Sequence, residues 1–292
     1  MQDLIQAFLD FLAGEKNYAD NTIAAYRNDL TQFLRYLDAQ GVQTKQPNWA
    51  DIDKQVIVGY ILDLKEREYT SSTVARKVAA IKSFFHYLMA EAIIKDDPTT
   101  TLDSPKVKKR LPKAISREDI ERLLAAPASI SAPKAQRDHA LLELLYASGM
   151  RVTELVSLNV TDVDTESGSV SVKGKKNVSK ERAIVIDDPA LEAVKVYLKK
   201  GRAQLLRDPN EVALFLNHRG QRLTRQGLWL IIKHYVEEVG ISDDVTPHTL
   251  RHSFAAHKLS QGKSLQDIQK LLGHANISTT QVYQQVSQDS EQ

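Results

Sequence analysis

The sequence predicts a mainly α-helical protein, with an N-terminal helical bundle and a mostly helical C-terminal domain that contains a small antiparallel β-sheet. Three observations support this prediction: apolar residues recur at helical spacing along most of the chain, only one short stretch alternates like β-strands, and a basic segment with prolines separates the two halves. At 292 residues the chain exceeds the usual size of one hydrophobic core. We therefore expect domains at residues 1–95 and 114–292, joined by a linker at residues 96–113.

The N-terminal half is expected to form a small all-helical domain. Helical spacing of apolar residues is found in four segments, namely residues 4–12, 23–37, 56–64 and 74–88. Polar side chains precede two of these segments, at residues 20–22 and 70–73. Their oxygens can accept hydrogen bonds from the free backbone N–H groups of a first helical turn.

The expected linker, DDPTTTLDSPKVKKRLPK, holds three prolines and several Thr and Ser residues without sustained periodicity. Five of its last eight residues are basic: Lys106, Lys108, Lys109, Arg110 and Lys113. A positive segment suits a chain that wraps an anionic polymer. A solvated charge run explains this segment equally well when it is considered alone.

Helical spacing resumes after the linker. Residues 116–119 resemble a cap for a helix over residues 120–124, and a helix over residues 138–146 is expected to end at Gly149. The alternation in SVSVKG and the β-rich run AIVI predict two strands between residues 168 and 186, joined by the loop GKKNVSK. Further helices are expected over residues 225–239, 247–259, 264–272 and 279–286.

Composition limits the class of protein. The chain has no cysteine, which excludes disulfides and thiolate metal sites and fits a reducing compartment. The acidic residues near the N-terminus argue against a signal peptide, and no apolar run reaches the roughly 18 residues that a membrane span requires. We therefore expect a cytoplasmic protein without a membrane association. The net charge of +2 does not by itself identify a nucleic-acid binder.

The segment TPHTLRHSFAAHKL combines a helix start with two cationic side chains. Thr246 is a suitable N-cap and Pro247 suits the first helical position, so His248 and Arg251 lie on the same side near the first turn. Free N–H groups of that turn also favour an anion, which makes this a candidate phosphate site. Solvated polar residues on a helix are the simpler interpretation of an isolated HxxR pattern.

His248 and His252 are four residues apart, a spacing found in some zinc hydrolases. A metal site is disfavoured here because Thr249 stands where those enzymes carry a glutamate base and because Arg251 would repel a cation. We expect no metal and a structural role for His252.

Other polar residues are ambiguous when considered singly. Gly149 can form a tight turn that directs Arg151 inward, towards an anion or towards Glu154 in an ion pair. Gly273 is expected to end a helix, which fixes His274 in the following turn. A tyrosine near the C-terminus, such as Tyr283, is usually a packing residue. The loop lysines Lys175, Lys176 and Lys180 would ordinarily be solvated.

Together, in order, these segments resemble the tyrosine recombinase (phage integrase) family. The resemblance runs through LLYASGMRVTEL, VKGKKNVSKERAIVI, TPHTLRHSFAAHKL and LLGHANISTTQVY, and YADNTIAAYRNDLTQFLRYL is similar to the family's helical (SAM-like) core-binding domain. Length and motif spelling are most similar to the Xer group, with phage and transposon integrases as the alternatives. The resemblance implies DNA cleavage and religation through a 3′-phosphotyrosyl intermediate, for DNA integration or for chromosome partition at cell division.

The resemblance also implies roles for six residues. Arg151, Arg251 and His274 would hold the scissile phosphate, and His248 would be the general acid or base. Lys175 would protonate the leaving oxygen, with Lys176 as the alternative because this loop is longer than the GKGNKER-like form, and Tyr283 would be the nucleophile. Arginine suits phosphate because its planar fork donates two parallel hydrogen bonds and stays charged. Neither ATP nor a metal is required, so no cofactor is expected.

The expected partner is a double-stranded DNA recombination site, bound by a homo- or hetero-tetramer with a related recombinase, and an activating regulator is a further expected partner. Segments 72–82 and 224–234 are candidate recognition helices. The predicted DNA contacts are Lys108, Lys109, Arg110, Arg76, Lys77, Lys82 and Arg225. The tail after Tyr283 is short for exchange between subunits. A catalytically silent accessory factor or a relaxing topoisomerase are the alternatives from other classes.

Overall fold

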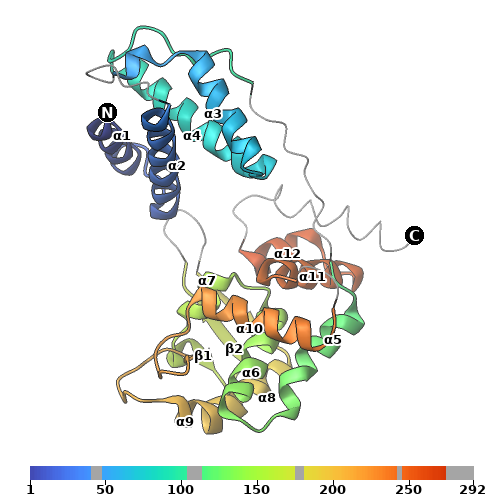
Figure 1. The fold of residues 1–292 in the computed structure, drawn as a ribbon. Coiled ribbons are helices and arrows are strands. Elements are labelled where there is room, and N and C mark those ends of the chain that lie inside the picture. Colours follow the sequence, from blue (N-terminus) through green and yellow to red (C-terminus); the bar gives the residue numbers. More distant parts are fainter. Residues whose placement is uncertain (41–47, 104–113, 175–180, 242–244, 274–292) are drawn as a thin grey trace. The chain divides into compact units, whose positions relative to one another are not determined.

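The computed structural model describes residues 1–40, 48–103, 114–174, 181–241 and 245–273 (Figure 1). The chain divides into two compact units, Met1–Lys109 and Arg110–Gln292, and the division falls within the segment expected to be a linker. Helices predominate and the described strands form one small antiparallel sheet, so the predicted fold class is confirmed. None of the helices in the described ranges is long and apolar enough to cross a membrane.

In the described part of the first unit, four α-helices form a bundle: α1 (Gln2–Gly14), α2 (Asp20–Ala39), α3 (Lys54–Glu66) and α4 (Ser71–Ala90). Thr70 caps α4, as expected, by accepting a hydrogen bond from the Thr73 N–H. The expected cap at residues 20–22 is wrong, because α2 begins at Asp20 after Ala19, which forms no side-chain cap. The core between the helices is rich in aromatic rings, including Phe8, Phe33, Trp49, Phe84 and Phe85.

Part of the segment assigned to the linker belongs to this bundle. Leu102 is buried in the aromatic core, and the Asp97 carboxylate accepts hydrogen bonds from the backbone N–H and the hydroxyl of Thr99. The turn over these residues is thereby fixed to the first unit, because its apolar side chain is out of water and its polar groups are paired. Composition indicated a linker here because a single buried leucine gives no periodic signal.

The second unit is built around the buried helix α6 (Pro133–Ser148), which packs against several neighbours. The other described α-helices before the sheet are α5 (Arg117–Ala125) and α7 (Val152–Ser157). After the sheet come α8 (Asp188–Val196), the π-helical segment η4 (Tyr197–Arg202), α9 (Ala203–Leu205), α10 (Arg225–Glu238), α11 (Pro247–Ser260) and α12 (Leu265–Leu272). The core surrounds α6, whose Leu141, Leu142, Leu144 and Leu145 are fully buried.

The sheet has the strand order β1-β2-β3, with β1 (Val163–Asp164), β2 (Ser169–Val172) and β3 (Arg182–Val185) all antiparallel. Strand β2 alternates as predicted, because Val170 and Val172 are buried while Ser169 and Ser171 are half-buried. The pairing of Val170 with Ile184 sets the register, and the short strand β1 was not predicted. Between β2 and β3 the structure describes Lys173, Gly174 and Glu181.

Candidate active site

Helix α11 holds Arg251 at the centre of the second unit. Thr246 caps the helix by accepting a hydrogen bond from the Thr249 N–H at 3.1 Å, and Pro247 occupies the first turn, as the sequence predicts. Arg251 is only 4% exposed. Its Nη1 donates to the Gly149 carbonyl at 2.5 Å and its Nη2 to the Leu272 carbonyl at 2.7 Å. The guanidinium thus joins the ends of α6 and α12.

Arg151 lies beside the same two helix ends. Gly149 ends α6 with a φ of 56°, in the left-handed region, and Arg151 follows directly before α7. The Nη2 of Arg151 donates to the Gly273 carbonyl at 3.2 Å. Two arginines that are far apart in sequence therefore donate to consecutive carbonyl oxygens, those of Leu272 and Gly273, immediately before His274.

The ion pair between Arg151 and Glu154, which the sequence left as an alternative, is present in the structure. Nη1 of Arg151 lies 3.2 Å from Oε1 of Glu154, whose other oxygen accepts the Arg151 backbone N–H at 2.7 Å. Arg182 also binds this carboxylate, with both Nη atoms at 3.0 Å from the two oxygens. Burial raises the pKa of Glu154, but hydrogen bonds from Arg182 and Arg151 outweigh it and lower the pKa.

Sequence reasoning missed Arg182, although a signal for it existed. Side chains two residues apart in a strand lie on one face, so Arg182 shares a face with Ile184 and Ile186. Both isoleucines are buried. A charged residue on the buried face of a strand requires a partner, and that requirement could have predicted an ion pair.

His248 is exposed on the first turn of α11, one turn before the buried His252. The two rings are stacked with their centroids 6.3 Å apart. Partial desolvation, followed by the charge of Arg251, lowers the pKa of His248 below its ordinary value of 6.5. The imidazole is therefore mostly neutral at pH 7 and has a ring nitrogen that can accept a proton.

The remaining candidate catalytic residues, Lys175 with its alternative Lys176, His274 and Tyr283, lie outside the described residues. Gly174 is the last described residue before the two lysines, and Gly273 is the last before His274. The structure thus brings together Arg151, His248 and Arg251 from the predicted set.

The predicted DNA contacts differ in their surroundings. Lys77 is only 3% exposed, and its ammonium donates to Asp29 at 2.9 Å and to Gln32 at 2.5 Å. We therefore remove Lys77 from the set, because burial between α2 and α4 withdraws its charge from the surface. Arg76 is half-exposed and also pairs with Asp29, whereas Lys82 is half-buried.

Arg225 is exposed at the start of α10. The same helix exposes Trp229 and Leu230, and the Lys233 ammonium lies 5.4 Å from the centre of the Trp229 ring. Lys108, Lys109 and Arg110 lie outside the described residues.

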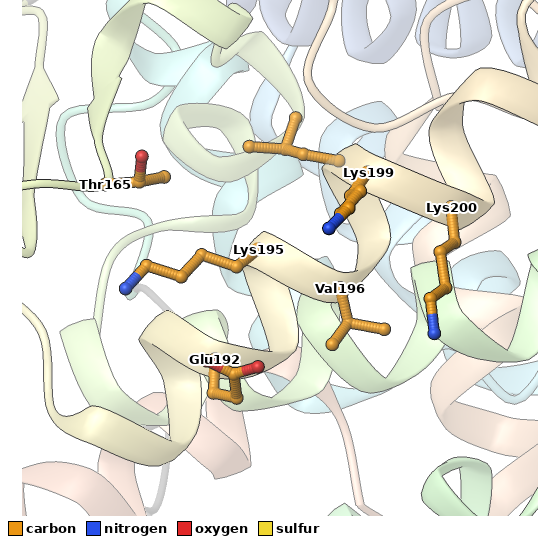
Figure 2. Close-up of a pocket in the computed structure, with 7 residues that line it drawn as sticks. Thr165, Glu192, Lys195, Val196, Lys199 and Lys200 are labelled. Carbon is orange, nitrogen blue, oxygen red and sulfur yellow. The ribbon is translucent and has the colours of Figure 1, made fainter.

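A cavity of about 730 Å³ lies elsewhere on the second unit, along α8 and η4 (Figure 2). Figure 2 shows the side chains of Lys195, Lys199 and Lys200 projecting from this helical stretch. Its lining is Thr165, Glu192, Lys195, Val196, Leu198, Lys199 and Lys200. Of the candidate catalytic residues that the structure describes, Arg151, His248 and Arg251, none contributes to this lining, so the arginine site is distinct from this cavity.

Comparison with known families covers most of the chain. The profile of the phage integrase family matches residues 113–290, and that of the phage integrase N-terminal SAM-like domain matches residues 5–92. Tyrosine recombinase XerC of Herpetosiphon aurantiacus is 50% identical, over 99% of this chain and 92% of the relative. Tyrosine recombinase XerD of Listeria monocytogenes serotype 4b is 43% identical, over 98% of this chain and 95% of the relative.

Solved structures share this fold. The crystal structure of XerA recombinase is 26% identical with a TM-score of 0.53, over 96% of this chain and 92% of the other. XerH site-specific recombinase bound to a palindromic difH substrate gives a TM-score of 0.77 at 21% identity, over 99% of this chain and 93% of the other. The profile matches, the identities and the shared fold together show that this chain belongs to the phage integrase family, among the Xer tyrosine recombinases that carry out site-specific DNA recombination.

Proposed function

We propose that this Xer recombinase cleaves and rejoins DNA at the cluster of Arg151, His248 and Arg251, with Tyr283 as nucleophile. One observation carries the proposal: Arg151 and Arg251 donate to the consecutive carbonyls of Gly273 and Leu272. This geometry fixes two guanidinium groups at the turn that leads directly to His274. Two fixed cations near a third candidate phosphate ligand suit a phosphodiester whose charge grows in the transition state.

The arginines would bind the non-bridging oxygens of the scissile phosphate, with His274 as a third contact. Arginine donates in parallel to phosphate oxygens and remains protonated throughout the reaction. Because backbone carbonyls hold the guanidinium planes before DNA binds, little reorganisation is needed when the phosphate arrives. Such preorganised donors stabilise the transition state more in a partly water-excluded site than they would in water.

His248 and Lys175 would move the protons. Neutral His248 accepts the proton of the Tyr283 hydroxyl, and the phenolic oxygen attacks phosphorus. The bond from phosphorus to the 5′-oxygen breaks, and Lys175 donates a proton to that oxygen. The products are a 3′-phosphotyrosyl link and a free 5′-hydroxyl, and religation is the same step reversed with a 5′-hydroxyl as nucleophile. The phosphotyrosyl link conserves the bond energy, so ATP is not consumed.

The partner would be a double-stranded recombination site bound by four subunits, of this chain alone or with a related recombinase. A lambda integrase structure that shares the fold is a tetramer bound to a Holliday junction. Helix α10 is our candidate recognition helix in the second unit, since Arg225 can contact phosphates while the exposed Trp229 and Leu230 can contact thymine methyl groups. A role in chromosome partition would place the protein in the cytoplasm with chromosomal DNA.

A plasmid resolution assay tests this proposal. The substrate is a plasmid with two directly repeated Xer-type recombination sites, and the product is two smaller circles. We expect the wild type to resolve it and Arg251→Lys to lose about 10²- to 10³-fold in rate, because one planar donor pair is removed from the transition state. Arg202→Lys is the matched control, since Arg202 is also partly buried and donates to the backbone carbonyls of Ala213 and Glu211.

Equal rates for Arg251→Lys and the wild type would contradict the assignment of the phosphate site. Specific binding without resolution or cleavage by the wild type would instead favour an accessory factor. Relaxation of the plasmid without resolution would favour a topoisomerase.

A further inference from the structure

The carboxylate of Glu154 lies between two arginines. Arg182 donates to it through both terminal nitrogens, with each N–O distance at 3.0 Å. Arg151 donates through Nη1 at 3.2 Å and through its backbone N–H at 2.7 Å. Each carboxylate oxygen therefore accepts from both residues, and the two guanidinium groups share one negative charge.

The three side chains are unequally exposed. Glu154 is 9% exposed and Arg182 is 11% exposed, whereas Arg151 is 31% exposed. A buried carboxylate is stable as an ion only if a partner compensates its charge with well-aligned hydrogen bonds. Arg182 provides the planar two-bond pairing, while the Arg151 side chain provides one longer bond. Arg151, Glu154 and Arg182 together carry a net charge of +1. This positive charge is consequently concentrated on Arg151, the most exposed of the three side chains.

Arg182 also connects the parts of the site. Its Nε donates to the Leu271 carbonyl at 2.9 Å, near the end of α12. It is the first residue of β3, the strand that follows the loop with the candidate lysine Lys175. A Cβ on Gly273 would lie 2.8 Å from Nη1 of Arg182, so the guanidinium fits directly against the turn that precedes His274.

We propose that Arg182 is a positioning residue that neutralises Glu154, so that Arg151 keeps its positive charge for the scissile phosphate. This inference rests on the proposed phosphate-binding role of Arg151. If Arg182 is removed, Glu154 has Arg151 as its main partner, and an approaching phosphate meets a neutral pair. If the negative charge of Glu154 is also removed, Arg151 regains its net charge although both native contacts are lost.

A purely structural brace would behave differently. Removing the Glu154 charge could then restore part of the stability lost with Arg182, as in any buried ion pair, but it would not restore the cleavage rate of molecules that are already folded. Only an electrostatic role predicts that the second substitution raises the cleavage rate of the folded Arg182 variant. The sign of this coupling therefore separates the two roles.

The test measures single-turnover formation of the covalent DNA adduct on a nicked duplex with a Xer-type site, over a range of DNA concentrations. Full-length wild type is compared with Arg182→Met, Glu154→Gln, the double variant and Arg182→Lys. We expect Arg182→Met to slow cleavage by about 10- to 100-fold, because Glu154 then offsets the positive charge with which Arg151 stabilises the transition state. The double variant should be clearly faster than Arg182→Met, and Arg182→Lys should retain more activity than Arg182→Met.

Arg222→Met is the control for the loss of a part-buried arginine. Arg222 donates to the carbonyls of Val156 and Leu158 and to the side chain of Asn159. Adding Glu154→Gln to the Arg222→Met variant should not raise its cleavage rate. Thermal unfolding of every variant identifies the temperature range in which all are folded, and cleavage is compared there.

Two results would overturn the inference while leaving the proposed function intact: unchanged cleavage by Arg182→Met, or a double variant no faster than Arg182→Met. If Arg182→Met does not fold, the test uses Arg182→Lys, which keeps the positive charge. A cleavage rate of Arg182→Lys below one-hundredth of the wild-type rate, with normal thermal unfolding, would show that the charge of Arg182 alone does not explain its role. If Arg151→Ala cleaves like the wild type, the phosphate assignment itself fails. Absence of any wild-type adduct would overturn the proposed function together with this inference.

Discussion

Gly149 is the residue on which the geometry of the two arginines depends most directly. It has a φ of 56°, its carbonyl accepts from Arg251, and a Cβ at this position would lie 2.3 Å from Cδ1 of Phe254. We expect Gly149→Ala to lower the free energy of unfolding by about 2–4 kcal/mol, because it adds a steric clash to left-handed backbone strain. Urea unfolding followed by circular dichroism measures this loss.

Gly240→Ala is the matched control for backbone strain. Gly240 has a φ of 67°, and a Cβ there would meet no atom within 4 Å. Gly240→Ala should lower the free energy of unfolding by about 1–2 kcal/mol, which is the cost of the backbone strain alone. Equal losses for the two variants would show that the contact with Phe254 is unimportant.

His248 should give cleavage an acidic limb at unusually low pH. Its pKa is lowered from 6.5 by desolvation and by Arg251, and a general base acts in its neutral form. The rate should therefore fall with decreasing pH, with a midpoint below 6.5. Cleavage at subsaturating DNA reports on the free enzyme, and His248→Gln should be slow and lack this limb. A midpoint above 6.5 would contradict the assignment.

Sequence motifs identified residues whose chemistry is local and missed those whose partners are distant. The HxxR spacing located His248 and Arg251 because both follow one helix start. Lys77 was misassigned because nothing near it in the sequence reveals that Asp29 is buried against it. Likewise, the pairing of Arg182 with Glu154 joins a strand to a helix, and only the folded chain brings them together.

At the scale of elements, periodicity and capping predicted most helices. Thr70, Ser116, Thr246 and Ser264 each accept a backbone hydrogen bond at the expected helix start. The cap of α2 was mispredicted because polar residues at 20–22 lie inside the first turn rather than before it. Short elements such as β1 lack the length to show a period, so pairing with β2 determines them.

The ion pair between α2 and α4 gives a prediction for the first unit. Asp29 is 1% exposed and pairs with the buried Lys77. We expect Asp29→Asn to cost about 3–5 kcal/mol in unfolding free energy, because a buried ammonium is left without a carboxylate. Chemical denaturation measures the loss, and Asp29→Asn combined with Lys77→Met should recover part of it.

Arg76→Ala is the control, since the Arg76 side chain is 48% exposed and its pairing with Asp29 should contribute no more than about 1 kcal/mol. If Asp29→Asn lowers the free energy of unfolding no more than Arg76→Ala does, the buried charge of Lys77 must be compensated by another group.

At the scale of the whole molecule, the chain consists of two units that each have a hydrophobic core. We expect the isolated fragment of residues 1–109 to fold as a helical domain, because its aromatic core is formed from its own helices. Circular dichroism with urea titration would show helical content and a cooperative transition. A fragment without such a transition would mean that the first unit depends on the second.

The two units differ in the candidate functional residues that they contain. Every candidate catalytic residue belongs to the second unit, while the first contributes Arg76, Lys82, Lys108 and Lys109 as candidate DNA contacts. Sequence order alone established this division, because the motifs lie after residue 113. The clustering of Arg151 and Arg251 required the fold, since 100 residues separate them in the chain.

Covalent capture of DNA by Tyr283 tests the central claim most directly. The protein is incubated with a nicked duplex that carries a Xer-type site, the mixture is denatured, and protein-linked DNA is separated by electrophoresis. The account predicts a protease-sensitive adduct with the wild type and none with Tyr283→Phe, which lacks the attacking oxygen while binding the same DNA. An adduct of equal yield with Tyr283→Phe, or no adduct from wild-type protein that binds the site specifically, would contradict it.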